Sequence, residues 1–384
     1  WSSDVCSSDL DSFGDLPAGY EAGYVDSLSN RSHSRSNGHD LNVGFNYSDD
    51  TWMFNASLGV TPQKRTIDRK VGKLYADTTM RMIDYQPMIW LSWRKKKMRV
   101  SLNYNGRTRQ PSLSDLMPLT DNSDPLYITR GNPDLKQMFM HTMHVSFQHP
   151  SKGISANLGW QMEKNSVTQV VLYDVQTGGR ETYPININGN WNTYGSADWW
   201  KRFGHFSLKL STSGRHSNRV SMINEDRSQQ PEKSTTRDTG LNCEMAASYQ
   251  PTWGGFDFST SWDYQYSLNS LNDNNTYTRY YNFRFDGYVD FPFGLQLRTD
   301  AGYILRSGTN IQKGEDDEIV WNARATWRFL KQRKAELSAY WADILGKRKS
   351  YARMATSDGF YESRTQEIKG YFIVTFKYNF RLMM

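Results

Sequence analysis

Tyr281-Asn282-Phe283-Arg284-Phe285-Asp286-Gly287-Tyr288-Val289 alternates in chemistry from residue to residue. The odd-numbered positions are aromatic, apolar or small, whereas most even-numbered positions are polar or charged. A period of two predicts a β-strand with one apolar face and one charged face. After the turn Pro292-Phe293-Gly294 the next stretch repeats the pattern. Two successive charged faces cannot line a dry core, so the sequence predicts a sheet with one side against lipid and the other hydrated.

Working outward from this stretch, the same alternation extends back to Leu41 and forward to the last strand. It gives about fifteen strands of roughly ten or more residues, which is enough to cross a bilayer when tilted. Short turns are predicted at 48–51, 94–97, 149–153, 201–204, 251–255, 292–294 and 331–334. Long polar connections are predicted at 110–135, 217–236, 269–276, 308–317 and 348–359. Short periplasmic turns and long outer loops are typical of outer-membrane barrels. The predicted fold class is therefore all-β, a transmembrane antiparallel β-barrel.

The composition agrees with this interpretation. The chain has 384 residues, a mean hydropathy of -0.74 and no apolar run near the ~20 residues of a membrane helix, which excludes a helical membrane protein. Aromatic residues make up 14% of the chain, and several tryptophans adjoin short turns, where a girdle at the headgroups would lie: Trp52, Trp93, Trp199, Trp200 and Trp253. A soluble sandwich or propeller is the alternative fold, but its strands would be shorter and would bury their apolar face.

Catalytic chemistry finds little support in the sequence. No nucleophile is grouped with a base, and His141 and His144, three apart on a strand, would point to opposite faces. Outside the first ten residues Cys243 is the only cysteine, which excludes an internal disulfide and a multi-cysteine metal site. Glu315-Asp316-Asp317-Glu318 could hold a hard cation, but a solvated loop is the simpler interpretation. We therefore predict no enzyme activity and no catalytic, cofactor-binding or metal-binding residue.

The net charge of +6 and the pI near 9.0 raise the question of nucleic acid. The basic clusters Arg94–Lys97, Lys201-Arg202 and Lys331–Lys334 fall in short turns, where they would meet lipid headgroups. Basic residues predicted on the lumen side would pair with acids such as Asp263, Asp286 and Asp300, or with a plug: Arg284, Arg298, Arg306, Arg324 and Arg328. The expected partner is outer-membrane lipid, with no nucleic acid.

The beginning of the chain suggests a gene fragment. Trp1–Leu10, when back-translated, resembles a common sequencing-library adapter, and there is no starting Met. The expected organisation is an artefact at 1–10, an extracellular loop at 11–40 and the C-terminal part of a barrel at 41–384, with the plug and first strands missing.

Two stretches resemble a known family. The first resembles the R-x-P and G-N-P-x-L-K-P-E elements of TonB-dependent transporter barrels. It comprises Arg107 and Arg109-Gln110-Pro111, then Leu116-Met117-Pro118 and Gly131-Asn132-Pro133-Asp134-Leu135-Lys136. The sequence departs from this pattern at Gln137-Met138. Asp343-Ile344-Leu345-Gly346-Lys347 resembles the D-L-L-N-K stretch of the penultimate strand. The family-motif residues to follow are Arg107, Arg109, Pro111, Gly131, Asn132, Pro133, Leu135 and Lys136.

The last strand resembles the C-terminal membrane-insertion signal of such barrels. The signal residues are Phe372, Val374, Phe376, Tyr378 and Phe380, and Arg381–Met384 follow them. The resemblance implies recognition by the barrel-assembly machinery and location in the outer membrane of a Gram-negative bacterium. It also implies a barrel of 22 strands, with a plug domain and the TonB complex as partners of the full-length protein, and energy-coupled uptake of a large or scarce ligand such as a siderophore, glycan, cobalamin or peptide. The alternative is a plugless outer-membrane barrel or surface-binding protein without TonB coupling.

Overall fold

A computed structural model describes residues 2–10, 30–71, 74–117, 120–121, 124, 126–174, 176–224, 230–271, 275–309, 317–356, 359–365 and 367–380. They divide into two compact units. The first covers the described residues up to Ser146, Gly159–Thr193 and Ser217–Thr235, and the second covers Phe147–Leu158, Tyr194–His216 and the chain from Thr236 onward. The division passes through five strands: β9 (Met138–His149), β10 (Ile154–Lys164), β13 (Trp191–Phe203), β14 (Phe206–Asn224) and β15 (Glu232–Tyr249).

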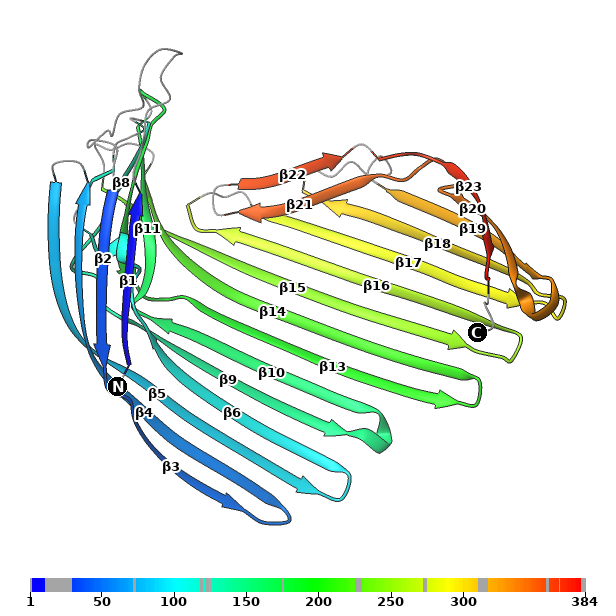
Figure 1. The fold of residues 1–384 in the computed structure, drawn as a ribbon, viewed down its shortest axis with the longest axis horizontal. Coiled ribbons are helices and arrows are strands. Elements are labelled where there is room, and N and C mark those ends of the chain that lie inside the picture. Colours follow the sequence, from blue (N-terminus) through cyan, green and yellow to red (C-terminus); the bar gives the residue numbers. More distant parts are fainter. Residues whose placement is uncertain are drawn as a thin grey trace. The chain divides into compact units, whose positions relative to one another are not determined.

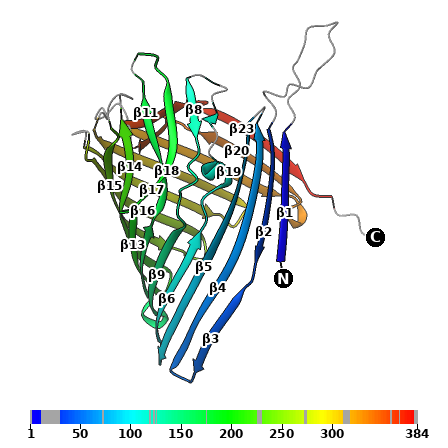
Figure 2. The ribbon, with the colours of Figure 1, turned by 90° about the vertical axis from the view of Figure 1, so that its left-hand side faces the viewer.

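The first unit is built around two long strands. β4 (Trp52–Val71) pairs with β5 (Leu74–Lys95) over their whole length, without a bulge. The lower half of β4 pairs with β3 (Leu41–Ser48) and its upper half with β2 (Asn30–Gly38). β2 also pairs with β1 (Ser2–Leu10), and β5 pairs with β6 (Met98–Arg109). Figure 2 shows β2 and β3 one after the other along one edge of β4, with β5 and then β6 on its other side.

Smaller elements complete this unit. They are α1 (Leu113–Leu116), β7 (Thr120–Asp121), β8 (Tyr127–Arg130), β11 (Ser166–Tyr173) and β12 (Arg180–Ile187). β11 and β12 form an antiparallel hairpin, and β8 joins the other edge of β12 in parallel. The end of β14 lies parallel to β11, with Val170 opposite Met222. The buried apolar residues of this region are Leu116, Met117, Leu135, Met140, Val170 and Val220.

The second unit is an antiparallel meander. β15 is followed by β16 (Gly254–Asn269), β17 (Thr276–Asp290), β18 (Leu295–Gly308), β19 (Glu318–Phe329) and β20 (Ala335–Ala342), each paired with the next. β20 pairs with the last strand, β23 (Tyr371–Tyr378), and Figure 1 shows these strands in order. Between β20 and β23 a separate hairpin is formed by β21 (Ser350–Thr356) and β22 (Gly359–Thr365).

The register confirms the alternation predicted from the sequence. Phe285 lies opposite Phe258 on one side and Ala301 on the other, and Ala301 lies opposite Trp321. The same face continues through Ala323, Trp341 and Phe372. Phe285, Trp321 and Trp341 are 38%, 42% and 49% exposed. A soluble sandwich would bury such side chains, so this exposed aromatic face requires lipid.

The strand count agrees with the sequence once loop elements are set apart. Among the described residues, the predicted wall of about fifteen strands corresponds to β3–β6, β9, β10, β13–β20 and β23. The helical content there is α1 with four residues and 3-10 turns at Pro150–Lys152 and Lys331–Arg333. No described helix has the length and hydropathy needed to cross a membrane.

Several predicted loops are wrong in extent. Residues 30–38, assigned to an extracellular loop, form β2. β4 is longer than β3, and β2 pairs with the remaining edge of β4, from Asn30↔Val71 to Gly38↔Gln63. Residues 11–29 lie outside the described part of the chain. The connection 217–236 is shorter than expected, because β14 reaches Asn224 through its contact with β11. The connection 348–359 contains β21 and the start of β22, and 110–135 contains α1, β7 and β8. The first two differences arise from strand pairing beyond the predicted ends, whereas the last two connections contain short elements of their own.

Candidate functional site

The short turns carry the expected aromatic residues. Trp52 and Trp93 are cross-strand partners, with ring centroids 6.3 Å apart, and Trp253 contacts Phe256 edge to face. Trp199 and Trp200 are successive residues of β13 and therefore point to opposite faces, so only one of them can join a lipid-facing girdle. In the turn before Trp52, hydrogen bonds from the Tyr47 hydroxyl and from the main-chain N–H groups of Trp52 and Thr51 lower the pKa of the Asp49 carboxyl.

The face opposite the aromatic residues is polar and internally paired. Arg298 contacts Asp286, as predicted, at 2.8 Å. The other predicted acids bond to amides instead: Asp263 accepts from Asn242, and Asp300 accepts from Asn322. Arg306 and Arg328 bind Glu318 and Glu336, each at 2.8 Å, and Arg324 lies 4.7 Å over the Tyr340 ring. Cross-strand neighbours on this face thus neutralise part of its charge.

The Gly131–Lys136 segment is fixed between α1 and β12. A Cβ on Gly131 would lie 1.7 Å from the Met117 carbonyl oxygen, so only glycine allows this approach. Asn132 donates from its main-chain nitrogen to the Asp115 carbonyl and from its side chain to the Pro184 carbonyl. Its Oδ1 accepts from the Asp134 nitrogen, which closes a turn around the exposed Pro133. Leu135 is 5% exposed and anchors the segment in the apolar core of this unit.

An asparagine on the neighbouring hairpin completes this cluster. Asn186 in β12 accepts from the Lys136 nitrogen at 2.7 Å and donates to the carbonyls of Lys136 and Asn165. Asn165 has a positive φ of 55°, and its nitrogen donates to the Asn188 side chain. Sequence reasoning missed these residues, although the run Ile185-Asn186-Ile187-Asn188-Gly189-Asn190 is a visible signal.

The other motif residues lie apart from this cluster. Arg107 and Arg109 are exposed on β6, on the face opposite Tyr104, and Pro111 is buried just after the strand. Gln137, where the sequence departs from the transporter motif, has a structural role, because its side chain donates to Asp84 at 3.2 Å. Gln63 and Gln110 donate to the same carboxylate. Three amides therefore hold one acidic group of β5 against the connection that follows β6.

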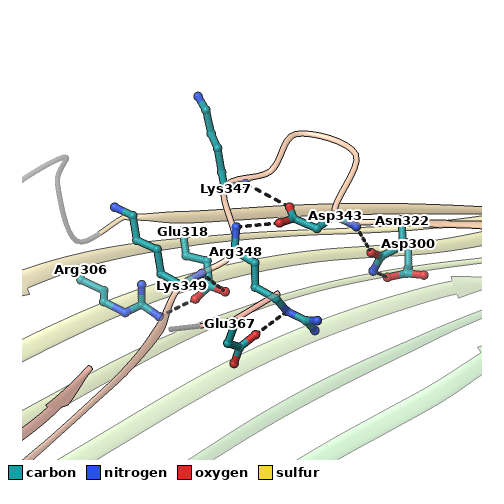
Figure 3. Close-up of polar contacts among 9 residues, drawn as sticks. All are labelled: Asp300, Arg306, Glu318, Asn322, Asp343, Lys347, Arg348, Lys349 and Glu367. Carbon is teal, nitrogen blue, oxygen red and sulfur yellow. Dashed lines mark hydrogen bonds and ion pairs between the residues drawn. The ribbon is translucent and has the colours of Figure 1, made fainter. Parts of the chain in front are cut away.

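The Asp343–Lys347 stretch forms a tight turn after β20 (Figure 3). Asp343 is 1% exposed and has a positive φ of 44°. Its nitrogen donates to Asn322 at 2.8 Å, and its two carboxylate oxygens accept from the nitrogens of Lys347 and Arg348, each at 3.1 Å. Beyond the turn Arg348 contacts Glu367 at 3.1 Å, and the Lys349 nitrogen donates to Glu318. The turn thus ties the end of β20 to β19.

The predicted insertion residues lie on the aromatic face of the second unit. Phe372, Val374 and Phe376 are 60–63% exposed and lie opposite Trp341, Ala339 and Leu337. β23 ends at Tyr378, and Phe380, 84% exposed, contacts the Tyr378 ring at 4.5 Å. Their side chains therefore extend the lipid-facing surface to the last described residues.

No metal site forms within the described residues. None of their His, Cys, Asp and Glu groups is clustered as a metal site would require. His141 bonds to the Tyr104 hydroxyl at 2.9 Å and stacks edge to face on Phe139. Of the predicted acidic run, 315 and 316 lie outside the described residues, Asp317 accepts from the Arg306 nitrogen, and Glu318 pairs with Arg306. Asp317 and Glu318 therefore form contacts within the sheet.

The family comparison agrees with the fold. Residues 79–236 match the model of the outer membrane protein beta-barrel family. No curated protein matches the sequence. Similar solved structures include an outer membrane protein of Vibrio cholerae, OmpT, with 8% identity, a TM-score of 0.32 and coverage of 91% of this chain and 97% of that one. Another is a bacterial polysaccharide outer membrane secretin, with 10% identity, a TM-score of 0.28 and 93% coverage of each chain.

The family match runs from β5 to the start of β15, and in β5 the register separates an apolar face from a polar one. The chain is an outer-membrane β-barrel protein of a Gram-negative bacterium, and its environment is the lipid of that membrane.

Proposed function

We propose that this chain belongs to the barrel of a TonB-dependent transporter that imports a large or scarce ligand. The observation that carries the proposal is the ordered packing of Gly131–Lys136, the segment most similar to the transporter motif. Gly131, Asn132, Leu135 and Lys136 each have a distinct partner in this unit. A segment held this firmly, beside a hairpin that rises above the membrane, suits a barrel whose outer loops form a defined ligand platform.

The polar face supports the same proposal. A line of charged and amide groups crosses β16 to β20, including the Arg298–Asp286 and Arg328–Glu336 pairs. Such a surface is hydrated or covered by a polar domain, because unpaired charges on it could not face lipid. A plug in the complete gene product would supply that cover. We expect no catalytic activity and no bound cofactor, and we expect β23 to be recognised by the barrel-assembly machinery.

Planar bilayers test the transporter proposal against a plugless barrel. The complete gene product, purified from outer membranes, should show no steady channel conductance, and removal of its plug domain should produce a large one. Arabinose should enter liposomes only through the plugless variant. The wild type should also bind the soluble periplasmic domain of TonB. Steady conductance of the complete protein together with no TonB binding would contradict the proposal and favour the plugless or surface-binding alternative.

A further inference from the structure

A cluster of three basic side chains lies on the outer face of the first unit. Arg35 in β2, Lys64 in β4 and Arg81 in β5 are all exposed. Lys64 and Arg81 are direct cross-strand partners, and Arg35 is diagonal to Lys64 because it pairs with Thr66. Figure 2 shows the three strands side by side. We call Arg35, Lys64 and Arg81 the outer basic cluster.

The bulge-free register between β4 and β5 fixes the face on which this cluster lies. Since side chains alternate strictly, Lys64 shares its face with Trp52 and Leu58, and Arg81 shares its face with Ile83 and Tyr85. Leu58, Ile83 and Tyr85 are 44–46% exposed and belong to the lipid-facing band. The opposite face of the same strands carries Gln63 and Asp84, which bond to each other. The outer basic cluster therefore faces the membrane side of the wall and not its lumen.

The height of the cluster follows from the strand geometry. Trp52, next to the periplasmic turn, and Lys64 are separated by about 12 residues of uninterrupted β4, each rising about 3.3 Å along the strand. With a tilt of about 40°, the separation along the membrane normal is about 30 Å, the thickness of the hydrocarbon layer. Trp93 and Arg81 are separated by the same number of residues on β5. The cluster therefore lies at the outer headgroup level, directly above Ile83 and Tyr85.

The described part of the chain gives these three charges no ion pair. Like charges directly opposite each other destabilise a sheet. Among the residues that the structure describes, no acidic side chain pairs with Arg35, Lys64 or Arg81. The acids next along this face, Asp68 and Asp77, lie opposite each other about four residues, or roughly 13 Å, from Lys64 and Arg81. Asp68 is also diagonal to Arg35, because His33 pairs with Asp68 and Arg35 pairs with Thr66, but the two side chains form no ion pair. Lys64 and Arg81 thus have no acidic neighbour on their face among the described residues, and an external anion would offset their mutual repulsion.

We propose that the outer basic cluster binds the phosphate groups of the phosphorylated glycolipid that forms the outer leaflet, while its acyl chains lie against Ile83, Tyr85 and Leu58. Arginine and lysine supply the charge-assisted donors that phosphate oxygens accept. Because an apolar band lies directly below the charges, an anion with acyl chains fits this surface better than inorganic phosphate does. This proposal does not depend on TonB coupling or on the presence of a plug.

Lipid binding to the complete gene product in detergent tests the proposal, with fluorescent lipid A as the probe. The variant Arg35→Gln/Lys64→Gln/Arg81→Gln should bind lipid A at least tenfold more weakly than wild type. The matched control Arg284→Gln/Arg298→Gln/Arg324→Gln removes the same charge from exposed positions on the polar face, away from lipid, and should leave the affinity unchanged. Unchanged binding by the cluster variant, or equal loss in both variants, would overturn the proposal.

A second measurement changes the lipid and leaves the protein intact. Lipid A stripped of its phosphates should bind wild-type protein at least tenfold more weakly, which tests the site even if the variant folds poorly. Inorganic phosphate and phosphatidylglycerol vesicles should compete only weakly with lipid A. Equal binding of dephosphorylated lipid A would refute recognition of phosphate, and competition by inorganic phosphate at equal concentration would refute the glycolipid as its source.

Discussion

Substitution of Ala301 by arginine should strongly destabilise the barrel. Ala301 lies on the lipid-facing side of β18, between Phe285 and Trp321 on the neighbouring strands. It is about six residues from Leu295, where β18 begins, and at about 2.5 Å of height per tilted residue it lies about 15 Å above the inner end. That position is near the middle of an apolar band about 25 Å tall.

A charge at the midplane of a barrel costs about 2 to 4 kcal/mol. The variant should therefore unfold at a urea concentration lower by about 1 M, if the unfolding slope is about 3 kcal/mol per M. The assay is heat-modifiable gel mobility of the full-length protein in a urea series, because a closed barrel stays compact in SDS until it is heated.

The matched control places the same arginine on the polar face. Asn282→Arg, on the adjacent strand β17, should change the urea midpoint little, because Asn282 lies on the face of Arg284 and Asp286. Asn322 is unsuitable for this purpose, although its position alternates correctly, because it is 9% exposed and bonds to both Asp300 and Asp343. If Asn282→Arg were damaging and Ala301→Arg harmless, the wall would be reversed and a soluble sandwich would explain the chain better.

Three further changes test the motif clusters and the last strand. Gly131→Ala should force the Met117 carbonyl away and expose 110–135 to protease, with the urea midpoint of the wall changed little; unchanged cleavage would contradict the close approach. Asp343→Ala should lower the free energy of unfolding by about 2 to 3 kcal/mol, because the nitrogens of Lys347 and Arg348 lose their acceptor. Asp343→Asn should lower it less, because asparagine keeps an acceptor oxygen and tolerates positive φ. Equal urea midpoints for the two variants would argue against the capping role. Removal of 370–384 should block insertion, because β20 would lose its partner β23, and equal recovery of the truncated protein in outer-membrane fractions would refute this.

The sequence by itself determined the alternating faces of the wall. The set Phe285, Ala301 and Trp321 could be assigned to one side because side chains alternate along a strand irrespective of the tertiary fold. Short turns such as Pro292–Gly294 were equally readable, because proline and glycine mark them locally. These are local properties, and they sufficed for the fold class.

Only the tertiary structure decided how the segments beyond the ends of the predicted strands pair and pack. Residues 30–38 become a strand because β4 leaves an edge there, and an edge is not visible in the sequence of the segment that pairs with it. Lys136 meets Asn186, fifty residues away, and Gln137 meets Asp84 across a similar separation. The outer basic cluster likewise depends on the register of three strands. Alternation sets which side of its own strand a residue faces, whereas partners distant in sequence are set only by packing and register.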